Sequence, residues 1–168
     1  MGMRLILVRH AKAYERDSTA WSDDSQRPLT EKGAKVFRRL AKRMRRESWS
    51  VDRVESSAFA RAWQTAEILN DAADWPQPIR NELLEGECGS ASLERLVCAL
   101  QAHRGSDALA WVGHEPMLSE LIARLVVGDS QARIVSMRKG AVVCLDLQFP
   151  VSAEGSLLAR IEWMMVPR

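Results

Sequence analysis

The sequence predicts an α/β protein, a three-layer α/β/α sandwich built around a central, mostly parallel sheet. The first observation is a set of continuous apolar runs, typical of strands covered on both faces, at residues 5–8, 108–112 and 142–145. The second is that segments of helical periodicity alternate with the strands along most of the chain, which favours parallel strands with helices on both faces. The third is the length of 168 residues, which fits a single domain over residues 1–168.

The first half of the chain contains two predicted strand–helix pairs. Residues 5–8 form the first strand, and a polar loop follows at 15–28. Thr30 can cap the next helix, because its hydroxyl can accept a hydrogen bond from a free amide of the first turn, and apolar residues then recur at helical spacing. Residues 52–56 are the second predicted strand, and the second helix starts at Phe59.

The second half continues this alternation. The segment 74–78 contains two prolines and ends the second helix, and Ser92 opens a third helix. The apolar strand at 108–112 follows. Pro116 then stands where a first helical turn tolerates proline, and Gly128 can end this fourth helix.

Two strands close the predicted fold. The run at 142–145 is apolar throughout, whereas residues 158–164 alternate apolar side chains with Arg160 and Glu162, as expected of a half-exposed strand near an edge. A predicted turn at 150–156 separates the two strands. We therefore expect them to pair antiparallel.

The composition limits the classes of partner. Hydrophobic residues make up 46% and charged residues 27% of the chain, as in ordinary globular domains. The net charge of +2 gives no electrostatic reason to expect nucleic acid, and no apolar run approaches the roughly 18 residues of a membrane span. The N-terminal run lacks a signal-peptide cleavage site, and Cys88, Cys98 and Cys144 are scattered, so we expect a cytoplasmic protein with reduced thiols.

Polar side chains follow three of the predicted strands at the point where each strand ends. Ligands of open α/β sheets bind outside the carboxyl ends of the strands, so we expect these side chains to meet at one edge of the sheet. They form the groups Arg9 and His10, then Ser56, Ser57 and Arg61, and then Gly113, His114 and Glu115.

Two arginines and two histidines gathered at one edge would repel one another without an anion, and a phosphoryl group supplies one. Arginine binds phosphate in a bidentate manner, and a neutral imidazole can attack phosphorus directly. Fixed cations can stabilise the transition state, so we expect no metal and no cofactor. His114 has no second histidine four residues later, which argues against a zinc protease motif.

Each of these residues also has a structural interpretation. An arginine and a histidine at a strand end are usually structural, and a histidine before Glu-Pro is often a helix cap. The basic residues of the predicted helix at 32–46 can form a solvated face or a docking surface for an acidic partner. Only the conjunction at three strand ends favours a catalytic site.

Four motifs occur in a characteristic order: LVRHAKA, RPLTEKG, SSAFARAWQTA and VGHEP. Together they resemble the histidine phosphatase superfamily, branch 1, whose members share the phosphoglycerate mutase-like fold. The short chain with RHAKA and RPLTEKG is similar to the SixA-type phosphohistidine phosphatases. The resemblance implies that His10 is the nucleophile, that Arg9, Arg61 and His114 hold the phosphoryl oxygens, and that the substrate is a signalling or phosphotransfer protein phosphorylated on histidine.

The chain departs from the family pattern at one position, and a second position, that of the proton donor, is matched by more than one residue. The family usually has glycine after the histidine, whereas this chain has Ala11, which adds only a methyl group. The family often places a proton donor on a later loop, where Glu82 matches best and Glu85 and Glu87 are the other acids. A solvated loop carboxylate is an equally good interpretation of Glu82, and a phosphohistidine substrate depends less on an acid, because its imidazole leaving group can take a proton from water.

Two other functions are compatible with the sequence. A small-molecule phosphomonoesterase or mutase of the same superfamily would need further cations and a lid, and neither is identified. A non-enzymatic binding module would use the basic helix at 32–46 and leave the histidines and arginines without a role. The short segments between the predicted helices favour a shallow, open site that admits a phosphorylated side chain.

Overall fold

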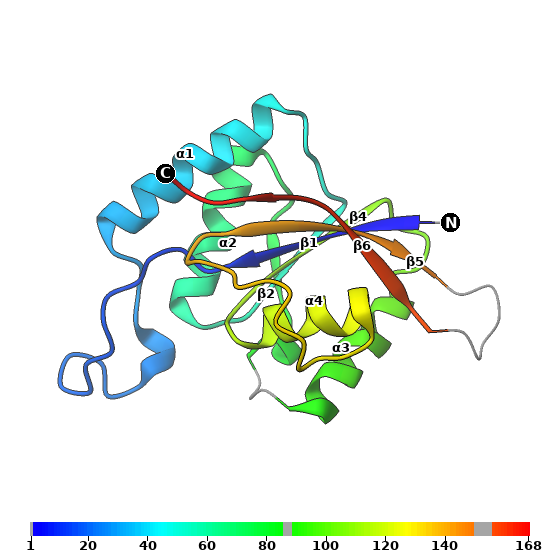
Figure 1. The fold of residues 1–168 in the computed structure, drawn as a ribbon. Coiled ribbons are helices and arrows are strands. Elements are labelled where there is room, and N and C mark those ends of the chain that lie inside the picture. Colours follow the sequence, from blue (N-terminus) through cyan, green and yellow to red (C-terminus); the bar gives the residue numbers. More distant parts are fainter. Residues whose placement is uncertain (1, 86–88, 150–155) are drawn as a thin grey trace.

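The computed structural model describes residues 2–85, 89–149 and 156–168, and its centre is one sheet in the order β3-β2-β4-β1-β5-β6 (Figure 1). The strands β3, β2, β4 and β1 are mutually parallel, β5 is antiparallel to β1, and β6 is antiparallel to β5. The predicted mostly parallel sheet and the antiparallel C-terminal pair are therefore confirmed. The strands are β1 (Gly2–Arg9), β2 (Arg53–Ser56), β3 (Pro78–Arg80), β4 (Ala108–Gly113), β5 (Val142–Gln148) and β6 (Leu158–Met165).

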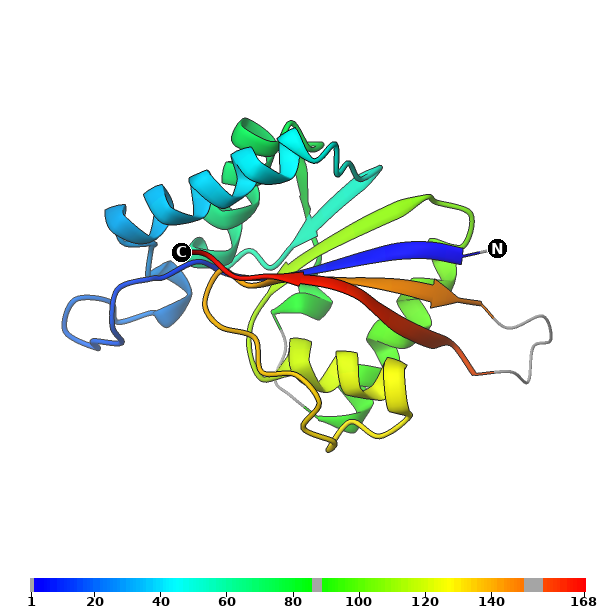
Figure 2. The same cartoon turned by 45° about the horizontal axis from the view of Figure 1, so that its top comes forward.

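Helices cover both faces of this sheet and complete the three predicted layers (Figure 2). The pair α1 and α2 packs on one face and the pair α3 and α4 on the other, so that each face has its own hydrophobic core. None of the described helices is long and apolar enough to cross a bilayer. The helices are α1 (Glu31–Arg46), α2 (Ala60–Ala73), α3 (Ser90–Ala102) and α4 (Met117–Val127), with single 3-10 turns at Asp24–Gln26 and Glu82–Leu84.

Strand β1 lies inside the sheet, between β4 and β5, which explains its continuous apolar sequence. Ile6 and Val8 belong to the core under α1 and α2, whereas Leu5 and Leu7 belong to the core under α3 and α4. All four side chains are at most 1% exposed. A strand that buries both of its faces needs apolar residues at every position, and this fixes the backbone that leads to His10.

The structure adds one strand to the sequence prediction and moves several element ends, among them the start of β1, which is Gly2 instead of Leu5. Strand β3 was not predicted, because it consists of three residues at the sheet edge, starts with a proline and is too short to show a period. Helix α3 begins at Ser90, two residues before the predicted Ser92. Of the predicted turn at 150–156, residues 150–155 lie outside the described residues, as does Cys88; Cys98 and Cys144 are free thiols.

The strand register brings three strand ends to the same level. Arg9 on β1 is paired with Gly113 on β4, and Ser56 on β2 is paired with Val112 on the other side of β4. The residues that come next are therefore neighbours at one edge of the sheet. The backbone N–H of His10 donates to the carbonyl of Gly113 at 3.0 Å, which locks the first two strand ends together.

Helix α1 makes an unusually close contact with the chain that follows His10. A Cβ atom added at Gly33 would lie 2.1 Å from the carbonyl oxygen of Lys12. The same carbonyl accepts hydrogen bonds from the backbone N–H of Thr30 at 3.0 Å and from its hydroxyl at 3.2 Å. The segment after the candidate nucleophile is thus fixed to the first turn of α1.

This contact makes the Gly33→Ala variant informative. Alanine normally stabilises a helix interior relative to glycine by roughly 0.5–1 kcal/mol. At Gly33 we expect the opposite sign, a loss of about 1–3 kcal/mol in the free energy of unfolding, because the added methyl group must push a backbone carbonyl aside. Urea unfolding monitored by circular dichroism measures the difference.

Gly89→Ala is the matched control for that experiment. Gly89 precedes α3, and a Cβ added there meets nothing within 4 Å. We expect its free energy of unfolding to fall by no more than about 1 kcal/mol, the usual size of an N-cap effect, because Gly89 is the N-cap of α3 and the methyl group meets no neighbour. A Gly33→Ala protein that is as stable as the parent would show that the contact with Lys12 relaxes without cost.

Candidate active site

The site is centred on His10, which is only 6% exposed at the end of β1. Its ring nitrogen Nδ1 lies 2.7 Å from the carbonyl oxygen of Ala11. Since a carbonyl can only accept, Nδ1 carries the proton and donates it, and the other nitrogen, Nε2, keeps its lone pair. The backbone N–H of Ala11 in turn donates to the hydroxyl of Thr65 at 3.0 Å, so α2 holds this peptide in place.

The environment of His10 favours the neutral imidazole. Burial is the main cause and lowers the pKa of His10 to about 4, and the charges of Arg61, Arg9 and Arg27 add to the effect. The hydrogen bond to Ala11 acts in the opposite direction but is weaker than the effect of burial. His10 is therefore neutral at physiological pH, which is the state that a nucleophile requires.

His114 follows β4 and lies beside His10, with 5.3 Å between the two ring centroids. This distance allows both imidazoles to contact one phosphoryl group. The Nε2 atom of His114 is 2.9 Å from the hydroxyl oxygen of Ser57, the residue after β2. Burial, followed by the proximity of His10 and Arg61, lowers the pKa of His114 to about 3.

Arg61 reaches the site from the first turn of α2 and is 7% exposed. Its Nη1 atom donates to the backbone carbonyl of Asp24 at 2.9 Å, and its Nη2 atom lies 3.2 Å from the carboxylate of the same residue. Asp24 also pairs with Arg27 at 2.9 Å. The hydrogen bond from Arg27 is the main reason that the pKa of Asp24 is held far below its usual range, so the carboxylate is charged.

Arg9 completes the cluster and is anchored by a hydrogen bond of 2.6 Å from Nη1 to the carbonyl of Met137. Burial lowers the pKa of Arg9 and of Arg61. Over the described ranges of the chain, three buried side-chain nitrogens have no hydrogen-bond partner, and all of them are in this cluster: Nε of Arg9, Nε of Arg61 and Nδ1 of His114. Buried donors without acceptors are costly, and an anion with several acceptor oxygens fits them.

The structure does not place Glu82 in this cluster. Its carboxylate is 82% exposed, and its nearest cationic group is Arg80 at 3.8 Å. Glu85 is 17% exposed, pairs with Arg80 at 2.9 Å and accepts from the backbone N–H of Ala58 at 3.1 Å, so it supports the loop after β2. Glu87 lies outside the described residues. The proton donor role of Glu82 stays a prediction.

The loop before α1 contributes to the site. The segment 15–28 was predicted only as a polar loop, but it contributes Asp24 and Arg27 to the surroundings of His10. The motif RPLTEKG contains Arg27, and a positive charge inside a motif is the signal that could have assigned it to the site. Asp24 carries no such signal, because its role depends on the fold of the loop.

The described residues contain no group of three or more histidine, cysteine, aspartate or glutamate side chains that could hold a metal ion. The donors that do converge are cationic or neutral nitrogens. This donor set fits a phosphoryl group, since guanidinium groups bind its oxygens and an imidazole lone pair can attack its phosphorus.

The two histidines should titrate far below the ordinary pKa of about 6.5. NMR spectra of ring nitrogens are expected to show His10 and His114 neutral at pH 6, with midpoints near 4 and 3. The unfolded state then binds more protons below about pH 6.5, so the free energy of unfolding should fall as the pH falls from 6.5 towards 4. A midpoint near 6.5 for His10 would contradict the burial described above.

An α/β/α sandwich that brings two histidines and two arginines together at the carboxyl ends of its parallel strands defines a protein of phosphoryl chemistry. The family model described as histidine phosphatase superfamily (branch 1) matches residues 5–116, and the chain belongs to this superfamily.

Two similar proteins and one solved structure support this assignment. The phosphohistidine phosphatase SixA of Escherichia coli (strain K12) is 27% identical over 128 residues, which cover 76% of this chain and 77% of that protein. The adenosylcobalamin/alpha-ribazole phosphatase of Salmonella typhimurium is 28% identical over 163 residues, covering 74% and 80%. A solved structure of the protein histidine phosphatase SixA complexed with tungstate matches with a TM-score of 0.79 and 25% identity, and the match covers 98% of this chain and 97% of that one.

Proposed function

We propose that the protein is a metal-independent phosphohistidine phosphatase that acts on a signalling or phosphotransfer protein through a phosphorylated His10. The observation that carries the proposal is the free Nε2 of His10 beside the unpartnered nitrogens of Arg9, Arg61 and His114. Nε2 of His10 is an uncharged nucleophile, and the nitrogens of Arg9, Arg61 and His114 are binding sites for phosphoryl oxygens. The four residues remain a proposed catalytic set.

In the first chemical step, the lone pair on Nε2 of His10 forms a bond to phosphorus while the bond from phosphorus to the substrate nitrogen breaks. The leaving imidazole takes a proton from water or from Glu82. Arg9, Arg61 and His114 stabilise the charge on the equatorial oxygens. Because the end of β1 is rigid, the nucleophile is already aligned when the phosphoryl group binds.

In the second step, water attacks the phosphorus atom of phosphorylated His10. The bond between phosphorus and Nε2 breaks, its electron pair returns to the nitrogen, and inorganic phosphate leaves. The low pKa of His10 favours this step, because a weakly basic nitrogen is a good leaving group. The carbonyl of Ala11 holds the ring in the same orientation throughout.

The protein substrate is supported by the similarity to the phosphohistidine phosphatase SixA. The solved SixA structure matches this fold over 98% of this chain and 97% of that chain, so the similarity includes every strand end that contributes to the site. Scattered cysteines with free thiols at Cys98 and Cys144 agree with the cytoplasm as the proposed location.

A small-molecule phosphomonoester is the second candidate substrate. It is favoured by the similarity to an adenosylcobalamin/alpha-ribazole phosphatase at nearly the same identity. A purely binding role has less support, because it would not use the neutral imidazole of His10 as a nucleophile and would not explain the three unpartnered buried nitrogens.

Hydrolysis assays separate these functions. We expect the protein to release phosphate from a phosphohistidine peptide in the presence of EDTA, with a higher kcat/KM than on phenyl phosphate. Loss of activity with EDTA would contradict a metal-independent mechanism. Activity on phenyl phosphate without activity on the peptide would favour the small-molecule candidate, and no activity on either would favour the binding role.

A further inference from the structure

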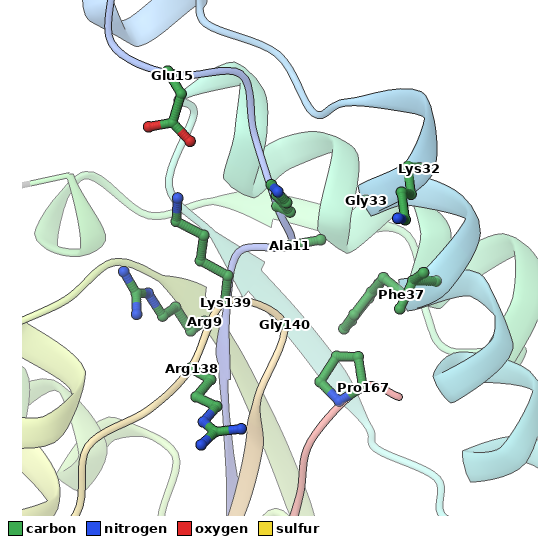
Figure 3. A pocket seen from close by; sticks show the side chains of 12 residues that line it. Arg9, Ala11, Glu15, Lys32, Gly33, Phe37, Arg138, Lys139, Gly140 and Pro167 are labelled. Atoms are coloured by element: carbon green, nitrogen blue, oxygen red, sulfur yellow. The ribbon is translucent and has the colours of Figure 1, made fainter.

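A cavity of about 580 Å³ lies immediately beside the candidate active site (Figure 3). Arg9 and Ala11, the two neighbours of His10 in the chain, line it. Figure 3 shows Arg9 and Lys139 across the cavity from Phe37, with the segment of Gly140 between them. The cavity is thus built by the end of β1, the start of α1, the turn before β5 and the C-terminal segment.

The lining of this cavity is strongly basic. It contains one carboxylate, Glu15, against five cationic side chains. Within the described parts of the chain, no ion pair or side-chain hydrogen bond is formed by four of these cations, and all four are exposed. They are Lys12, Lys32, Arg138 and Lys139; the fifth cation is Arg9.

The frame of the cavity is fixed relative to the nucleophile. The carbonyl of Lys12 is held by Thr30 at the start of α1, and the N–H of Gly140 donates to the carbonyl of His10 at 2.9 Å. Gly140 has a φ of 78°, and a Cβ atom there would lie 2.7 Å from Pro167. An anionic group bound in the cavity would therefore have a defined position relative to a phosphoryl group at His10.

The positive charge continues from the cavity along α1. Five cations at spacings of three or four residues share one face of this helix, and all are exposed. None of the five takes part in an ion pair with another described residue, unlike Arg38, which pairs with Asp71. The five are Lys32, Lys35, Arg39, Lys42 and Arg46.

We propose that the basic cavity and this face of α1 bind an acidic segment next to the phosphohistidine of the protein substrate. Most of the cations are exposed lysines, which act as hydrated point charges and suit carboxylates in varied positions, whereas a second phosphate is better bound by buried arginine forks. The cationic surface is also longer than a small substrate. It therefore fits a protein partner, whose approach it accelerates by electrostatic steering.

This proposal rests on the proposed function, because it names a feature of the same substrate. The test compares two phosphohistidine peptides that differ only in their flanking residues, three acidic residues on each side in one and the corresponding amides in the other. For the parent protein at low salt, kcat/KM is expected to be roughly tenfold higher for the acidic peptide, and the difference should shrink in 0.5 M NaCl.

The decisive variant is the double replacement Lys32→Glu and Lys139→Glu. It should remove or reverse the preference for the acidic peptide while leaving turnover of phenyl phosphate within about twofold, because neither lysine belongs to the proposed catalytic set. Arg133→Glu is the control, because this substitution changes the net charge in the same direction. Arg133 is exposed and does not line this cavity. This variant should keep the preference.

The possible results separate the two proposals. Equal rates on both peptides, or a preference that survives the double replacement, would overturn the docking surface and leave the proposed function intact. A lysine-dependent preference confined to 4-carboxyphenyl phosphate over phenyl phosphate would assign the cavity to a small acidic substrate and also overturn it. Failure to hydrolyse either peptide, with phenyl phosphate still hydrolysed, would overturn both proposals.

Discussion

Replacing His10 with alanine is expected to abolish turnover, with a loss of roughly 10⁴-fold or more in kcat. The reason is that burial keeps His10 neutral and the hydrogen bond from Nδ1 to Ala11 leaves the lone pair on Nε2 free to attack phosphorus. His114→Ala should slow turnover but leave the nucleophile in place. The fold should survive His10→Ala, because β1 is held by its apolar residues and by two neighbouring strands.

The measurement is a rapid alkaline quench after mixing the protein with a labelled phosphohistidine donor, followed by peptide mapping. A phosphorylated imidazole is stable in base and labile in acid, which distinguishes it from a phosphoserine. Label is expected on the peptide with His10 and on no peptide of the His10→Ala variant. His103→Ala, at the end of α3, is the control and should label normally. Label on His114, or an active His10→Ala protein, would refute the assignment.

The second large effect is expected for Arg61→Lys. Lysine keeps the charge but loses the planar fork, so one transition-state contact to the phosphoryl oxygens is lost. The expected cost is roughly 2.7–4 kcal/mol, or about 10²–10³ in kcat. Steady-state kinetics on phenyl phosphate measures this loss, and a thermal unfolding curve shows whether the protein remains folded without the two-point contact to Asp24.

Arg38→Lys provides the comparison for this variant. Arg38 also donates to a carboxylate, that of Asp71, but it lies on the exposed part of α1, away from the cluster. An exposed ion pair contributes little, so its replacement should change kcat by less than about twofold. Near-normal turnover of Arg61→Lys would show that Arg61 has a structural role in holding the loop of Asp24.

The elements that could be predicted are those in which all residues share one environment. A strand that is buried on both faces must be apolar throughout, so β1, β4 and β5 were evident from the sequence. The meeting of His10 and His114 could also be predicted, because parallel strands end at the same edge of the sheet.

The features that could not be predicted depend on tertiary contacts, which leave no periodic pattern in the sequence. Strand β3 exists because β2 offers it a free edge. Glu82 was chosen by its place in a motif, but its direction depends on the path of a loop, and the structure turns it towards solvent. The pairing of Asp24 with Arg61 joins residues 37 positions apart through a loop whose shape no short motif encodes.

The carboxylate of Asp24 on the guanidinium of Arg61 has a consequence for product release. Any phosphate that enters must compete with an anion that belongs to the protein, so substrate and inorganic phosphate are both bound more weakly than by a free arginine. This weakening acts equally on ground state and product, and it does not by itself slow the chemistry. After hydrolysis, Asp24 can return to Arg61 as phosphate departs. We therefore expect Asp24 to weaken the inhibition of this protein by inorganic phosphate.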